Sequence, residues 1–277
     1  MKAKTASKLT RVIIYVGLTA GVLVIIIPFY WMVISSIKPS GEIFTYPPIA
    51  IPKELYIGHY IKLFSETYFL RNFMNSLFIA SAYTIISTFF CSLGGYALAK
   101  FRFPGRNTLF FIILGSLMIP LPVTIIPLFF LISKFGWINA YPSVILPFSA
   151  SAMGIFMMRQ NMLGIPNDLL DAARIDGCSE FAIYYKVLLP VIKPALVTYI
   201  IIAFLWSWND FLWPLIALKT EEMLTLPLFI NNSRGQYNID YGRIMSSSTL
   251  ATLPVVVVFA FMARKVIAGA LAGSIKG

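Results

Sequence analysis

The stretch Asn167–Pro190 reads NDLLDAARIDGCSEFAIYYKVLLP and is a long polar interval inside a largely apolar sequence. Asn167 or Asp168 can cap a helix, and acidic side chains in its first turn favour the helix dipole. Gly177 is a natural end for this helix, because glycine adopts a left-handed turn without steric cost. A second short helix is expected from Ser179. The stretch therefore predicts two short helices joined at a glycine turn.

The first helix of this stretch has one face that could meet a partner. By their spacing, the side chains on that face are Asp168, Asp171, Ala172 and Ile175. The adjacent small residues Ala172 and Ala173 let a backbone approach closely, as in a helix docked in another protein's groove. An ordinary surface helix-turn-helix fits the same pattern. The second helix should bury an apolar side made of Phe181, Tyr184, Tyr185 and Leu188.

The composition is that of a membrane protein. Of the 277 residues, 58% are hydrophobic and only 12% are charged, with a mean hydropathy of +0.81. A soluble domain carries about a quarter charged residues. The net charge of +11 could suggest nucleic acid, but the basic residues are scattered between apolar runs. We expect membrane lipid as the surroundings and no nucleic-acid partner.

The apolar runs predict an all-α polytopic protein with one transmembrane domain over residues 1–277. A spanning helix needs about 20 apolar residues. The six expected spans are about 12–33, 73–97, 107–133, 141–158, 194–218 and 244–263. The third contains Pro120, Pro122 and Pro127 and should be kinked or broken.

The distribution of charge predicts the orientation. Six spans put both termini on one side, and a cytoplasmic N-terminus places 14 of the 22 lysines and arginines inside. Cytoplasmic loops carry an excess of these residues. The loop 159–193, with the stretch Asn167–Pro190 in it, is then cytoplasmic.

Residues for catalysis, metal or cofactor binding are not evident. Cys91 and Cys178 are expected at different depths, and the single histidine, His59, has no companions for a metal site. The phosphate-binding pattern GxxxxGK[ST] does not occur. We therefore expect no catalytic residues, no metal and no bound cofactor in this chain, and an energy source on another subunit.

Asp210 is the one acid inside an expected span, within SWNDFLWP (207–214). Such residues are costly in a membrane and often functional. It could cap a helix that breaks before Pro214, with Trp206, Trp208 and Trp213 at the membrane interface. Alternatively, a translocation path is lined here, since aromatic rings, a carboxylate and an amide suit sugars. The candidates for that path are Trp208, Asn209, Asp210, Trp213 and, at the broken third span, Pro120.

The stretch Asn167–Pro190 also carries a family resemblance. Asp171-Ala172-Ala173, three residues, Gly177, nine residues and Val187-Leu188-Leu189-Pro190 resemble the EAA loop of ABC importer permeases, with Asp171 in place of Glu and Val187 in place of Ile. The resemblance implies a type I importer permease whose loop 167–190 docks on an ATP-hydrolysing subunit. The implied coupling residues are Asp171, Ala172, Ala173, Asp176, Gly177 and Pro190.

Further blocks resemble the carbohydrate branch, and within it the second membrane subunit of maltose-type transporters. They are YALAKFRFPGRN (96–107), GIFMMRQ (154–160), AARIDGCSEF (172–181), SWNDFLWPL (207–215) and AGSIKG (272–277). The resemblance implies import of a di- or oligosaccharide through the plasma membrane of a prokaryote. The implied partners are a second permease, an ATPase dimer that holds ATP and Mg, and an extracytoplasmic binding protein.

Two contacts of the chain ends and loops follow from the same resemblance. The tail residues Gly273, Ser274 and Lys276 would contact the ATPases. The outer loop 219–243 would enter the binding protein's cleft through Arg234, Gln236 and Tyr237. Two alternatives stay open: a permease for a non-sugar solute, and an ion-coupled secondary transporter, which would need more intramembrane acids than Asp210.

Overall fold

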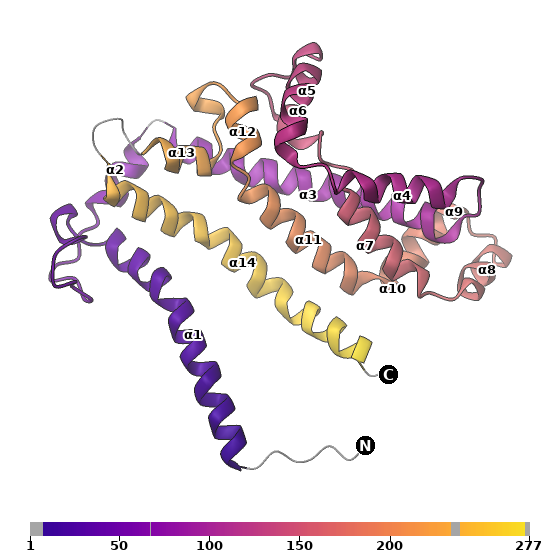
Figure 1. The fold of residues 1–277 in the computed structure, drawn as a ribbon, viewed down its shortest axis with the longest axis horizontal. Helices are drawn as coiled ribbons and strands as arrows, with labels where there is room; N and C mark the ends of the chain where they lie inside the picture. Colours follow the sequence, from indigo (N-terminus) through magenta and orange to yellow (C-terminus); the bar gives the residue numbers. More distant parts are fainter. Residues whose placement is uncertain (1–7, 67, 234–238, 275–277) are drawn as a thin grey trace. The chain divides into compact units, whose positions relative to one another are not determined.

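The computed structural model describes residues 8–66, 68–233 and 239–274, and their regular elements are helices (Figure 1). The chain divides into two compact units. The first comprises Met1–Thr67 and Ile230–Thr252, and the second comprises Tyr68–Phe229 and Leu253–Gly277. The prediction of an all-α fold is confirmed.

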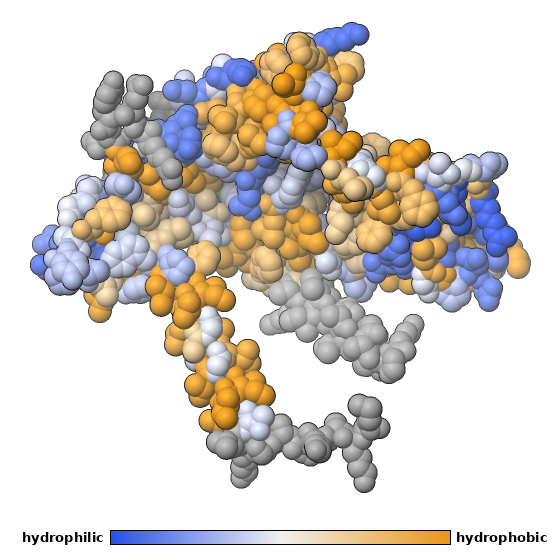
Figure 2. Space-filling model, in the orientation of Figure 1, coloured by the Kyte–Doolittle hydropathy of each residue, from blue (hydrophilic) through white to orange (hydrophobic). Residues whose placement is uncertain are grey.

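The first unit holds α1 (Lys8–Ser36), the 3-10 turn η1 (Ser40–Glu42), α2 (Gly58–Ser65) and the beginning of α14 (Tyr241–Ser274). Most apolar side chains of α1 are exposed, and Figure 2 shows the described part of the helix as mainly orange, with paler patches between. A helix that is apolar all round suits a lipid or protein environment rather than water.

Polar contacts join α2 to the start of α14. Lys62 pairs with Asp240 at 2.8 Å, and Arg243 pairs with Glu66 at 2.5 Å. Gly242 has no room for a side chain, because the His59 ring occupies the place of a Cβ. The two ion pairs and this close approach fasten the start of α14 to α2.

The second unit is organised around α3 (Phe69–Lys100), which packs against α7 (Ala152–Leu163) and α11 (Lys193–Trp208) (Figure 1). The approach of α3 to α7 is close: a Cβ on Gly95 would lie 2.5 Å from the Cβ of Met158. The remaining elements of this unit are α4 (Arg106–Ser116), α5 (Leu121–Lys134), α6 (Tyr141–Ile145), α8 (Asn167–Ile175), α9 (Glu180–Ala182), the π-helical turn η2 (Ile183–Leu188), α10 (Leu189–Val191), α12 (Leu212–Ala217), the 3-10 turn η3 (Glu221–Met223) and α13 (Leu226–Asn232), whose end reaches the first unit.

Three helices of the described chain are long and apolar enough to cross a membrane, and there are up to five spans if each sharply bent helix pair counts as one. They are α1, α3 and α14, at the expected spans 12–33, 73–97 and 244–263. The expected span 107–133 is broken as predicted, since α4 and α5 meet at 102°. The expected spans 141–158 and 194–218 each consist of two helices with a non-helical interval, at 146–151 and 209–211. Six crossings, their orientation and the single domain stay predictions.

Hydrophilic side chains gather at one end of the second unit. In Figure 2 the blue surface surrounds the region of α8 and α9, whereas orange covers much of α4 and α5. The long polar stretch of the sequence therefore forms a distinct polar end on an apolar helical body.

Candidate functional site

The loop at this polar end has the predicted backbone. Helix α8 follows Pro166 and ends before Gly177, which has a φ of 79°, in the left-handed region that favours glycine. The predicted cap is wrong in one respect: Asn167 begins the helix without capping it. Its side-chain oxygen instead accepts a hydrogen bond from Lys100 Nζ at 3.0 Å. The Asn167 side chain therefore bonds Lys100 of α3 and not the backbone amides of its own helix.

Helix α8 presents the predicted face to the surface. The exposed side chains are Asp168, Asp171, Ala172 and Ile175, and Ile175 is 87% exposed. Leu170 and Ala173 lie on the opposite side and are buried within the chain. Ala172 is therefore open to a partner, whereas Ala173, predicted beside it on the docking surface, packs inward. An exposed isoleucine beside a small residue suits a helix that docks on another protein.

Arg174 connects α8 to the second arm of the loop. Its guanidinium donates to Asp171 Oδ1 at 2.6 Å and to Glu180 Oε1 at 2.7 Å. The Tyr96 hydroxyl of α3 donates to Glu180 Oε2, also at 2.7 Å. These hydrogen bonds, that of Arg174 first, lower the pKa of Glu180. Asp171 thus has a basic partner, Arg174, within the loop itself.

The last turn of α3 holds both arms of the loop. Tyr96 bonds Glu180 after the glycine turn, and Lys100, four residues later, donates to the Ile165 carbonyl oxygen at 2.5 Å and to Asn167 before the helix. Residues four apart lie on one face of a helix. Both arms of the loop are therefore hydrogen-bonded to the same turn of α3.

In the arm that follows Gly177, the buried side chains differ in part from the predicted ones. Ser179 begins the second helix as predicted, and its Oγ accepts a bond from the Ala182 backbone at 3.3 Å. The π-helical turn Ile183–Leu188 then inserts an extra residue into the helical period. Tyr184 and Leu188 are buried as predicted, whereas Phe181 and Tyr185 of the same predicted apolar side are exposed. The surface near α8 thus carries more apolar area than the 3.6-residue period predicts, and Asp176 and Pro190 are exposed as well.

A second candidate site lies where α11 ends, in the stretch SWNDFLWP. Asn209 Nδ2 donates to the Leu205 carbonyl oxygen at 2.7 Å and closes the end of α11. The backbone amides of residues 211–213 lie close to the Asp210 carboxylate, at the start of α12. Helix α12 begins after Phe211 without a side-chain cap bond, so a capping role of Asp210 stays a prediction.

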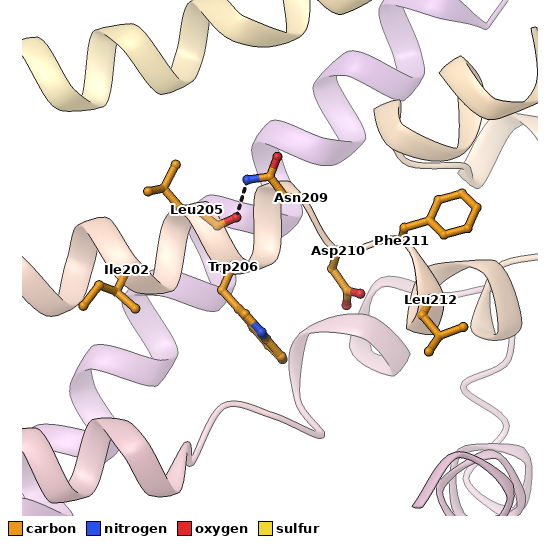
Figure 3. Close-up of a pocket in the computed structure, with 7 residues that line it drawn as sticks. All are labelled: Ile202, Leu205, Trp206, Asn209, Asp210, Phe211 and Leu212. Atoms are coloured by element: carbon orange, nitrogen blue, oxygen red, sulfur yellow. Dashed lines mark hydrogen bonds between the residues drawn. The ribbon is translucent and has the colours of Figure 1, made fainter. Parts of the chain in front are cut away.

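The break lines a cavity of about 660 Å³. Its lining residues are Ile202, Leu205, Trp206, Asn209, Asp210, Phe211 and Leu212 (Figure 3). In Figure 3 the side chains of Trp206 and Asp210 point to the same side, whereas the amide of Asn209 turns toward Leu205. An aromatic face beside a carboxylate can bind a ligand with both apolar and hydroxyl groups.

The structure brings Asn209 and Asp210 together at this cavity but not the other predicted path residues. Trp213 is fully buried, and its indole N–H donates to the Ser143 carbonyl oxygen at 2.8 Å. Trp208 is buried too and stacks on Phe204. Pro120 is exposed at the start of α5 and does not line the cavity.

Trp206 is the lining residue that sequence reasoning missed as a path residue. It is 46% exposed and lies on the cavity wall. The sequence could have indicated it, because Trp206 lies four residues before Asp210 and residues four apart share a face of a helix. Trp208, only two residues away, faces the opposite side of α11.

The remaining predicted contacts are not placed by the structure. Arg234, Gln236, Tyr237 and Lys276 lie outside the described residues. Gly273 and Ser274 belong to α14, but their side chains also lie outside the described part. Within the described residues, no group of three or more His, Cys, Asp or Glu side chains could hold a metal ion.

A helical membrane chain with this loop is typical of importer membrane components. The chain matches, over residues 92–269, the family described as "Binding-protein-dependent transport system inner membrane component". It belongs to this family and is a multi-pass membrane protein.

Curated relatives cover almost the whole chain. It is 40% identical to the arabinooligosaccharides transport system permease protein AraQ of Bacillus subtilis, over 92% of both chains. It is 33% identical to the lactose transport system permease protein LacG of Rhizobium radiobacter, over 97% of both. These relatives are sugar permeases, and this chain belongs with the carbohydrate branch.

A solved structure supports the fold. A chain of a bacterial ABC transporter involved in import of the acidic polysaccharide alginate matches with a TM-score of 0.82. The match is 21% identical and covers 95% of this chain and 99% of that one. The fold of the chain is that of a type I ABC importer permease.

Proposed function

We propose that this chain forms half of the translocation path of an ATP-driven importer for a neutral di- or oligosaccharide. The observation that carries the proposal is the 40% identity to an arabinooligosaccharide permease over 92% of both chains. The cavity beside Trp206 and Asp210 supports a sugar, because a ring face can stack on the indole while hydroxyls meet the carboxylate.

Energy would enter through the polar loop. The exposed face of α8, with Ala172 and Ile175, docks on a cytoplasmic ATPase dimer, which binds ATP and Mg and carries out the hydrolysis. Closure of that dimer displaces α8, and the bonds from Tyr96 and Lys100 carry the displacement to α3. Nucleotide thereby shifts the populations of inward-facing and outward-facing states.

Two further partners complete the proposal. A second, homologous permease supplies the other half of the path. An extracytoplasmic binding protein delivers the sugar, and the segment with Arg234, Gln236 and Tyr237 would contact it. The tail with Gly273, Ser274 and Lys276 would reach the ATPases. In the plasma membrane of a prokaryote, this arrangement imports the sugar against its gradient.

The test is reconstitution of the chain with its candidate partner subunits. The expected result is ATP hydrolysis by the complex that rises when a sugar-loaded binding protein is added. The matched control is the same complex with the binding protein free of sugar. Hydrolysis that sugar does not stimulate, for any neutral di- or oligosaccharide tried, would contradict the proposal.

A further inference from the structure

A second cavity lies directly beside the first within the second unit. Its volume is about 470 Å³, and it shares Ile202 and Trp206 with the first cavity. Its other lining residues are Tyr83, Ser116, Leu117, Pro147, Phe148, Ala150, Ser151, Ala152, Met153, Tyr199 and Ala203. Each cavity has a volume within the range of about 300–1,000 Å³ that is usual for small-ligand sites.

Three helix breaks border this pair of cavities. The break between α11 and α12, at residues 209–211, lines the first cavity. The interval 146–151 between α6 and α7 lines the second, as does the end of α4 at Ser116 and Leu117. Non-helical backbone at membrane depth is tolerated only within protein or along a water-filled cavity. Three breaks at the rims of these cavities fit a water-filled space at this place in the fold.

Trp206 is the wall between the two cavities. Its ring packs on Tyr83 and on Phe148, with centroid distances of 5.5 Å in both cases. The two contacts hold the indole in place while 46% of the residue stays exposed. A large aromatic surface that is held rigid and borders water is well suited to stack against a sugar ring.

The polar groups at the cavities are mostly hydroxyls and one acid. The second cavity is lined by Ser116 and Ser151, whose hydroxyls can accept bonds even where they already donate one, whereas the Tyr199 hydroxyl is buried against Ser87 and Cys91. Asp210 is the only charged residue among those that line either cavity. A single carboxylate without a basic neighbour in the lining repels an anionic ligand and accepts bonds from hydroxyls.

We infer that the two cavities are adjoining subsites for successive rings of one neutral saccharide, with Trp206 as their shared stacking wall and Asp210 as the group that rejects acidic sugars. The inference rests on the proposed function and deepens it. It predicts a substrate of at least two rings. It also predicts discrimination against uronic acids within the membrane subunit, independent of the binding protein.

The test uses the complete complex in proteoliposomes and single cysteines in a Cys178→Ser background; Cys91 is fully buried. Met153→Cys reports on the second cavity and Leu212→Cys on the first. Ile112→Cys is the matched control, because Ile112 is 66% exposed in the chain but lines neither cavity. A charged methanethiosulfonate reagent should modify the two cavity positions and leave the control position unmodified.

Protection by sugar then tests the subsites. Linear arabinotriose or lactose, presented with the binding protein, should slow modification at both cavity positions by about tenfold, equivalent to about 1.4 kcal/mol. A disaccharide of glucuronic acid should protect neither. Trp206→Ala should remove the protection at both positions, and Trp206→Phe, which keeps a ring, should restore most of it.

The outcomes separate this inference from the proposed function. Modification of Met153→Cys that no sugar slows, in a complex that imports the sugar, overturns the two-subsite inference alone. Protection confined to Leu212→Cys also overturns it, since one ring site would then suffice. Equal protection by the glucuronic acid disaccharide overturns the role of Asp210. Failure of the wild-type complex to import any sugar overturns the proposed function, and the inference with it.

Discussion

The hydrogen bond between Tyr96 and Glu180 offers a sharp test of how the loop is joined to the membrane helices. Tyr96→Phe removes one hydroxyl and leaves the ring, which packs against Phe101 and Tyr184. A hydrogen bond to a charged group contributes about 1.5–3 kcal/mol. The Glu180 side chain is 45% exposed, so we reduce the expected loss to about 1 kcal/mol, a factor of about five.

The assay compares sugar uptake with ATP hydrolysis in the reconstituted complex. Tyr96→Phe should lower the sugar imported per ATP by about fivefold while hydrolysis persists. The reason is that α8 can still dock on the ATPase, but one of the hydrogen bonds that link the loop to α3 is missing. Glu180→Gln should behave similarly, and the double variant should be no worse than the more severe single one. The matched control is Tyr185→Phe, an exposed tyrosine of the same arm. Unchanged coupling in Tyr96→Phe, or equal loss in Tyr185→Phe, would refute the reasoning.

Three further predictions concern the loop and its support. Gly177→Val should strain the backbone by about 1–3 kcal/mol, because Gly177 has a φ of 79°. Sugar uptake, measured relative to the amount of protein in the membrane, should fall while membrane insertion stays normal; uptake at the wild-type rate would contradict this. Gly95→Ala should lower the unfolding temperature, because the added Cβ would lie 2.5 Å from a carbon of α7, at a cost of about 1–3 kcal/mol. Gly115→Ala is the control, since its Cβ would meet no atom within 4 Å, and equal unfolding temperatures of the two variants would refute the prediction. The fold lowers the pKa of Glu180, so the Glu180 carboxylate stabilises the protein above its ordinary pKa of 4.5, and this stabilisation is lost as the pH falls below that value. The unfolding temperature should therefore fall more on acidification for the wild type than for Glu180→Gln.

Local backbone chemistry was the part of the loop that the sequence could predict. The glycine turn at Gly177 and the helix start at Ser179 depend on residues within a few positions, and both are confirmed. The cap at Asn167 failed because Lys100, 67 residues earlier, takes its side-chain oxygen. The apolar side of the second arm was half right: Tyr184 and Leu188 are buried and Phe181 and Tyr185 are exposed, and no sequence pattern predicted the π-helical turn Ile183–Leu188.

For the cavity, too, the sequence predicted local features but not the packing between helices. Proline and acid positions predicted the breaks in the third and fifth spans, since these follow from missing donors and buried charge. Which tryptophan faces the cavity depends on how α11 packs against α3 and α7. That packing buries Trp208 and leaves Trp206 exposed. The adjacency of the two cavities depends on contacts between α4, α7 and α11, which helical periodicity in single segments does not contain.

The central claim is that this chain imports sugar at the expense of ATP hydrolysed by a partner. The most direct measurement is uptake of a labelled neutral oligosaccharide into proteoliposomes that contain the complete complex, with ATP or an ion gradient as the only energy source. Uptake should require ATP and the binding protein, and it should persist when proton and sodium gradients are collapsed. Uptake driven by an ion gradient without ATP would contradict it.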